Sequence, residues 1–260
     1  MRYTCTVDEP QQKLSFAFPK PGAVMISLIA GMFCLWAVMA SLAKWGESTV
    51  LFDTLVGRPD RLFSEPWRIF TNPFVHDYRG LPHVLTRLVM LYFMATSLEQ
   101  RWGKARFIGF LVAVASLSSF VELLVERLVP WFQVSGVVFG STAMINAACV
   151  AWAANMKGAQ VRLYGAVPMN ATVLLVMLVV MNVLAVVWGA PAEGYLTPFV
   201  AMGLGFLLSD VSPLRRFYLQ NKYKRLALKS ARIRVQREGR AELRVIQGGA
   251  SKKPDRSMLN

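Results

Sequence analysis

The sequence has very little histidine and few candidate metal ligands. Only two histidines occur among its 260 residues, and none lies beyond position 83. Its three cysteines have no CxxC spacing, and two of them lie inside long apolar runs. Zinc sites and disulfide frameworks need closely spaced Cys and His groups. We therefore expect no metal site and no cofactor, and we interpret Cys5, Cys34 and Cys149 as packing residues or free thiols.

Charge is missing from long stretches of the chain. Hydrophobic residues make up 55% of the sequence, and they gather in runs close to the ~20 residues that a helix needs to cross a bilayer. The first run is too long for a cleaved signal peptide and follows acidic residues. The sequence predicts an all-α integral membrane protein with six transmembrane helices, at 23–44, 81–98, 105–128, 132–156, 167–189 and 195–209.

Acidic residues are also scarce, at 15 against 29 Lys and Arg. The segment after Asp210 contains 14 of the basic residues and only three acidic ones, so its net charge is 14 − 3 = +11. Basic residues near the ends of spans mark the cytoplasmic side, which predicts that both termini are cytoplasmic. We expect a cytoplasmic N-terminal segment at 1–22, a membrane domain at 23–210 and a basic cytoplasmic tail at 211–260. We also expect the protein to lie in a bacterial inner membrane.

The basic tail favours one class of partner over another. Basic residues beside a cytoplasmic span bind anionic lipid at ~1 kcal/mol each when they lie close to the surface. Proteins that bind single-stranded nucleic acid need aromatic side chains along the basic surface. Here the aromatic residues of the tail cluster at its start, at Phe217, Tyr218 and Tyr223. We therefore expect contact with anionic lipid and no nucleic acid partner.

One part of the chain carries several distinctive residues in a fixed order. A Trp-Arg pair lies in the long outer connection. One histidine comes after it in that connection, and a second lies within the second predicted span. A Leu-Glu pair, followed by a glycine, marks the end of that span. These residues are Trp67, Arg68, His76, His83, Leu98, Glu99 and Gly103. The arrangement resembles the rhomboid family of intramembrane serine proteases. A looser resemblance extends over 23–210 and leaves out the tail. It implies a rhomboid-like helical bundle that contacts the lipid bilayer.

The resemblance also implies roles for individual residues. In an active rhomboid, a serine on the fourth span attacks the peptide carbonyl, a histidine on the sixth span is its base, and second-span His and Asn side chains support the oxyanion. His83 matches the second-span histidine, and Arg87 occupies the place of the asparagine. Ser141 matches the nucleophile, with Ser135 as a rival. The position of the base histidine is occupied by Val200.

A rhomboid without its base is expected to lose most of its rate enhancement, because the members of a serine–histidine unit act together. His76 falls in the outer loop, so we do not expect it to replace the missing histidine. We interpret the chain as a pseudoprotease that binds transmembrane segments of client proteins. The alternative is a rhomboid-type serine endopeptidase that uses Ser141 or Ser135 with an unusual base. A channel or transporter is less favoured, because the intramembrane ionisable residues cluster at one end of two spans.

Two charged residues in neighbouring spans suggest a structural pair. Arg87 and Glu122 each lie about six residues from the outer ends of the second and third spans. A charge in the membrane is costly, and pairing offsets that cost. We therefore predict an ion pair between Arg87 and Glu122. The alternative is that Arg87 extends outward to the interface.

Overall fold

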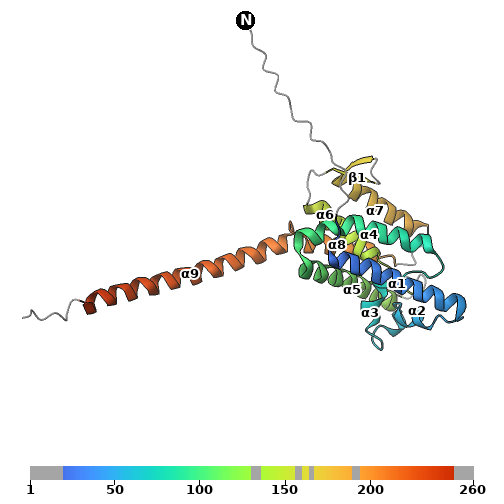
Figure 1. Cartoon of the computed structure of the whole chain (residues 1–260), viewed down its shortest axis with the longest axis horizontal. Coiled ribbons are helices and arrows are strands. Elements are labelled where there is room, and N and C mark those ends of the chain that lie inside the picture. Colours follow the sequence, from blue (N-terminus) through green and yellow to red (C-terminus); the bar gives the residue numbers. More distant parts are fainter. Residues whose placement is uncertain (1–19, 130–135, 156–159, 164–166, 189–193, 249–260) are drawn as a thin grey trace, which may run out of the picture. The chain divides into compact units, whose positions relative to one another are not determined.

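The computed structural model describes residues 20–129, 136–155, 160–163, 167–188 and 194–248 (Figure 1). The chain divides into two compact units, Met1–Val211 and Ser212–Asn260. The first unit contains a bundle of helices. The second unit contains one long helix, α9 (Pro213–Gly248).

Three helices of the first unit are long and apolar enough to cross a membrane. They are α1 (Ala23–Trp45), α4 (Leu81–Trp102) and α5 (Lys104–Leu128). The others are shorter: α6 (Thr142–Asn155), α7 (Ala171–Val187) and α8 (Thr197–Leu208). At 1.5 Å per residue, the 14 residues of α6 extend only about 21 Å. A membrane helical bundle is therefore established, while the count of six spans stays a prediction.

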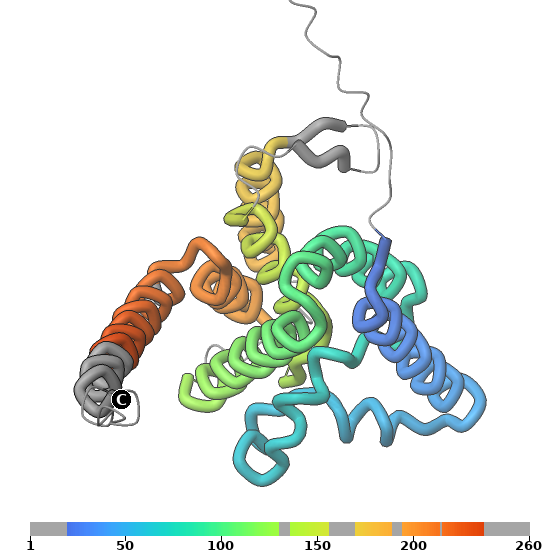
Figure 2. Tube along the Cα trace, turned by 60° about the vertical axis from the view of Figure 1, so that its left-hand side comes forward, coloured from blue at the N-terminus to red at the C-terminus, as the bar shows by residue number. Residues whose placement is uncertain are grey.

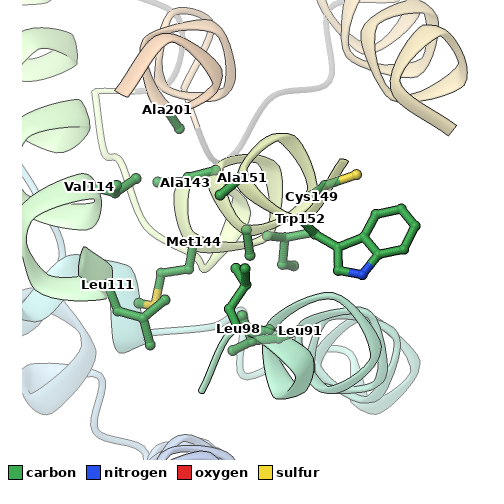
Figure 3. Close-up of a cluster of buried hydrophobic side chains, with 14 of the residues drawn as sticks. Leu91, Leu98, Leu111, Val114, Ala143, Met144, Cys149, Ala151, Trp152 and Ala201 are labelled. Atoms are coloured by element: carbon green, nitrogen blue, oxygen red, sulfur yellow. The ribbon is translucent and has the colours of Figure 1, made fainter. Parts of the chain in front are cut away.

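Helix α6 is at the centre of the bundle and contacts α4, α5, α7 and α8. Eleven of its 14 side chains are buried, and many of them are alanine, so neighbouring backbones approach closely. Figure 3 shows this core, with Met144 of α6 beside Leu111 and Ala143 beneath Ala201 of α8. Helix α1 packs mainly against α4 at one side of the bundle (Figure 2).

The run at 167–189 does not begin as a helix. Its first residues form β2 (Val167–Asn170), which pairs antiparallel with β1 (Gln160–Leu163). Pro168 has no N–H to donate within a helix interior, and proline disfavours helical backbone in the residue before it. Helix α7 starts only after Asn170, which has extended backbone angles of φ −74° and ψ 149°. Apart from this short pair, the regular structure of the described residues is helical.

A second set of short helices folds the connection between α1 and α4. They are α2 (Val50–Leu55), η1 (Pro59–Arg61), α3 (Arg68–Thr71) and η2 (Asn72–Phe74). Proline lies in the first turn of both η1 and η2, where its missing N–H costs no internal hydrogen bond. Helix α3 and both η helices contact α5, so the connection is packed against the bundle.

The N-terminus of α1 is capped by a distant buried carboxylate. The backbone N–H groups of Val24 and Met25 each donate a hydrogen bond of 3.0 Å to Glu99 on α4. Gly22, at the N-cap, has no side chain to offer, and a Cβ there would lie 2.1 Å from Glu99 Oε1. Glu99 is 4% exposed. It therefore satisfies helix N–H groups inside the protein, where water does not reach them.

The N-terminus of α8 is capped in the same way by Glu122 of α5. Its two carboxylate oxygens accept hydrogen bonds from the backbone N–H groups of Tyr195, Leu196 and Thr197 at 2.8, 2.6 and 2.5 Å. Gly194 precedes them with φ +89°, and a Cβ there would lie 2.7 Å from Glu122 Cδ. The first N–H groups of a helix stabilise a carboxylate directly, so Glu122 has partners that the sequence did not suggest. The ion pair of Glu122 with Arg87 stays a prediction.

We predict that Glu122→Ala destabilises the bundle by on the order of 3 kcal/mol, because three N–H groups lose their acceptor inside the protein. Glu122→Gln keeps one carbonyl acceptor and should cost less. Thermal unfolding in detergent micelles measures both changes. The exposed carboxylate of Asp60 provides the control, since Asp60→Ala should leave the midpoint almost unchanged. Equal midpoints for Glu122→Ala and the control would contradict this account of α8.

Candidate functional site

The folded connection before α4 is held by Arg68. This side chain is only 3% exposed, and its guanidinium donates to the carbonyl oxygens of Asp53 and Val56, the latter at 2.8 Å. It also forms an ion pair with Glu65. Desolvation acts to raise the pKa of Glu65, but hydrogen bonds and charge from Arg68 and Arg61 outweigh it and lower that pKa. Arg68 thus fixes the loop, while neighbouring Trp67 is 47% exposed.

The same connection pairs with the segment that precedes α6. Gly57 and Val138 exchange two backbone hydrogen bonds, of 2.8 and 2.9 Å. The Gly140 N–H donates to the carbonyl oxygen of Asn72 at 3.1 Å, and the Ser119 hydroxyl of α5 donates to Asn72 Oδ1 at 2.9 Å. Gly140 has φ +110°, a left-handed conformation that favours glycine. These contacts place the outer connection directly beside the start of α6.

The result is a buried contact between His76 and Ser141. Their Nε2 and Oγ atoms lie 3.1 Å apart, and both side chains are 0% exposed. The His76 ring centroid is 6.4 Å from that of His83, at the start of α4. The sequence interpretation excluded His76 as a partner for the serine because of its place in the outer loop. The structure corrects that reasoning, because the loop folds back into the bundle.

A histidine nitrogen within hydrogen-bond reach of a serine hydroxyl is the basic geometry of an activated nucleophile. This pair differs from an open active site in one respect, which is its complete burial. A peptide carbonyl must reach the serine oxygen for acyl transfer, and at 0% exposure neither side chain is accessible to it. The geometry therefore suits a buried structural hydrogen bond in this conformation.

The sixth predicted span presents small residues to α6. Ala201 is buried, and one turn later Gly205 approaches α6 so closely that a Cβ would lie 2.6 Å from the carbonyl oxygen of Ala147. Val200 is half-buried, and Gly203 is exposed. Since the sequence has no histidine after His83, α8 supplies no imidazole base at any of these positions.

The remaining candidate residues are distributed as follows. His83 and Arg87 are half-buried and lie four residues apart on α4, so they share one face of that helix. Ser135 falls outside the described residues. Among the residues that the structure describes, no group of three or more His, Cys, Asp or Glu side chains could hold a metal ion.

We predict that His76 and Ser141 are energetically coupled. Ser141→Ala leaves a buried imidazole nitrogen without this partner, and His76→Phe leaves the hydroxyl without it, so each single change should destabilise the protein. The double variant should cost about 1 kcal/mol less than the sum of the single changes. Thermal unfolding of the four proteins measures this coupling. Strict additivity would show that the 3.1 Å contact has no energetic role.

Comparison with known proteins identifies the family of this chain. The model of the Rhomboid domain matches residues 64–211. A rhomboid protease GlpG of Salmonella choleraesuis (strain SC-B67) is 31% identical over 103 residues, which are 39% of this chain and 36% of the relative. The GlpG of Salmonella typhi is 30% identical over 115 residues, or 44% of this chain and 40% of the relative. The chain thus matches well under half the length of these relatives. With a matching domain over more than half of its residues, the chain belongs to the rhomboid family and is an integral membrane protein.

Proposed function

We propose that this rhomboid binds transmembrane segments of other membrane proteins and does not cleave them. The observation that carries the proposal is the environment of Ser141. Its hydroxyl contacts His76 in a fully buried position, and α8 has Val200 at the place that the family resemblance gives to the base. A serine without an accessible base is a poor nucleophile. The helical bundle around it is still available for binding.

The proposed client helix lies beside α4 and α7. Helix α7 buries only Ala171 and Leu174 of its side chains. It is joined to α6 by a hydrogen bond of 2.8 Å from Asn182 Nδ2 to Asn146 Oδ1. Several of its large apolar side chains are exposed, among them Val173, Val176, Val180, Met181, Val183 and Val187. A helix that is held by so few buried contacts can yield to a competing helix.

Two polar side chains of α4 support the same binding region. His83 and Arg87 are half-buried near the outer end of this helix. Within a bilayer, a polar group of a client helix has no water to bond with, so side chains of this kind offer hydrogen bonds that lipid cannot. This chemistry would favour clients with an acceptor group in the outer half of their span.

The proposed placement is a bacterial inner membrane with both termini in the cytoplasm. The basic residues of the tail and of the short connections support this orientation through the positive-inside rule. The Salmonella relatives support a bacterial membrane. In this placement the tail faces the anionic lipids of the cytoplasmic leaflet.

Site-specific crosslinking in native membranes tests the binding role. A photoreactive residue at Arg87 should capture discrete membrane proteins, because the proposed client lies against this face of α4. The matched control is Ile26, which is 55% exposed on α1 and should contact mainly lipid. Capture of the same proteins at similar yield from both positions would contradict a specific binding face. Intact clients in the crosslinked product would support binding without cleavage.

A second candidate is a serine endopeptidase, and the 3.1 Å distance between His76 and Ser141 favours it specifically. A conformational change that exposes both side chains to a substrate while keeping them in contact would provide an accessible serine–histidine dyad. A fluorophosphonate probe distinguishes the two functions. We expect no labelling of the folded protein in detergent or in liposomes. Labelling that disappears in both Ser141→Ala and His76→Phe would support the protease and overturn the binding-only function.

A further inference from the structure

Helix α9 carries charge of one sign over most of its described length. Between Pro213 and Gln236 the sequence contains eight basic residues and no acidic ones: Arg215, Arg216, Lys222, Lys224, Arg225, Lys229, Arg232 and Arg234. Like charges three or four positions apart on a helix repel each other, and no Asp or Glu occurs between positions 213 and 236. The helix is therefore suited to an anionic partner outside the chain.

Four of these residues form a basic stripe. Lys222, Arg225, Lys229 and Arg232 follow one another at spacings of three, four and three residues, so they lie on one face of the helix. All side chains from 222 to 236 are exposed. The positive stripe is accordingly accessible over about three turns, at 3.6 residues per turn.

An apolar stripe runs beside the basic one. Tyr223, Leu226 and Ile233 each follow a basic residue of the stripe by one position, which is about 100° around the helix. The small residue Ser230 lies between Leu226 and Ile233 on the same face. Tyr223 is 68% exposed, Leu226 51% and Ile233 52%. An apolar face bordered by lysine and arginine is the pattern of a helix that lies in the plane of a membrane interface.

We propose that this combined face of α9 binds the anionic surface of the bilayer, with the apolar stripe in the headgroup region and the basic stripe against lipid phosphates. Only four residues separate α9 from the apolar helix α8, so the membrane surface is at high effective concentration. Phe217 and Tyr218, at the start of α9, are 66% and 64% exposed, and aromatic residues are enriched at membrane interfaces.

Two other partners fit these observations less well. A second copy of the chain would bring equal positive charges together along the stripe, which opposes pairing. Leu228 and Val235 lie on another face, and an interface between copies would have to use them instead. Nucleic acid binding favours aromatic side chains distributed along the basic surface, whereas those of α9 lie in its first eleven residues.

The inference extends the proposed contact of the tail with anionic lipid by assigning it to a particular face. It is tested on the full-length protein, with Cys5, Cys34 and Cys149 replaced by serine and an environment-sensitive fluorophore attached at Ser230→Cys. The protein is reconstituted into vesicles of phosphatidylcholine alone or with phosphatidylglycerol in both leaflets. We expect several-fold slower quenching by an aqueous quencher in the anionic vesicles, and high salt should reverse this protection because it screens surface charge.

Two variants of equal net charge identify the face. The stripe variant is K222Q/R225Q/K229Q, and the matched control is R216Q/K224Q/R234Q, whose three residues lie away from the basic stripe. Protection should be lost in the stripe variant and largely kept in the control. Equal loss in both variants would overturn the assignment to this face. Equal quenching in neutral and anionic vesicles would overturn lipid binding. So would protection from the quencher that increases with the number of protein molecules per vesicle, or protection that an added oligonucleotide produces in neutral vesicles.

The result of this quenching experiment does not depend on whether the protein binds client helices. Anionic lipid is present in both leaflets and the quencher is present on both sides of the membrane, so the result does not depend on the orientation of the protein. Fluorescence at Ser230→Cys also requires no client. If crosslinking at Arg87 fails while α9 is still protected from the quencher, only the proposed client binding is wrong. If α9 is not protected while crosslinking succeeds, only the proposed lipid binding of α9 is wrong.

Discussion

The bundle depends on satisfying helix N–H groups where no water is available. Two helices begin at buried carboxylates that come from other helices, α1 at Glu99 and α8 at Glu122. Each carboxylate stabilises the positive end of a helix dipole and replaces the side-chain cap that both helices lack. These contacts also fix relative positions, since Glu99 joins α4 to α1 and Glu122 joins α5 to α8. Gly22 and Gly194 make room for the carboxylates, so the packing and the caps depend on each other.

The same requirement shapes the polar interior beside α6. The outer connection brings Asn72 and His76 among apolar helices, and each finds a partner there. Asn72 pairs with Ser119 and with the Gly140 N–H, and His76 pairs with Ser141. Buried polar groups that lack partners are costly, so a network of this kind specifies one arrangement of the loop. A serine and a histidine that would define catalysis at an open surface here contribute to the position of the loop.

The sequence predicted those parts of the fold that composition alone determines. Helices α1, α4 and α5 follow from long apolar runs, and their bounds differ from the predicted ones by a few residues at most. The partners of Glu122 and His76 could not be predicted, because they lie 73 to 75 and 65 positions away in the chain. Hydropathy carries no information about such pairings. A glycine within three residues of the start of an apolar helix, as at Gly22 before α1 and Gly194 before α8, was the available signal for a buried cap.

Three residues that maintain this bundle are distinct from the serine and histidine that the family resemblance assigns to catalysis. Arg68 holds the loop through backbone carbonyls, Glu99 caps α1, and Gly205 permits the close contact of α8 with α6. None of these roles requires a base on α8. Replacing a polar imidazole by an apolar side chain in a membrane helix removes a group that needs a hydrogen-bond partner, so the change need not cost stability. The bundle can therefore lose its catalytic chemistry and keep the helix surfaces on which the proposed binding function depends.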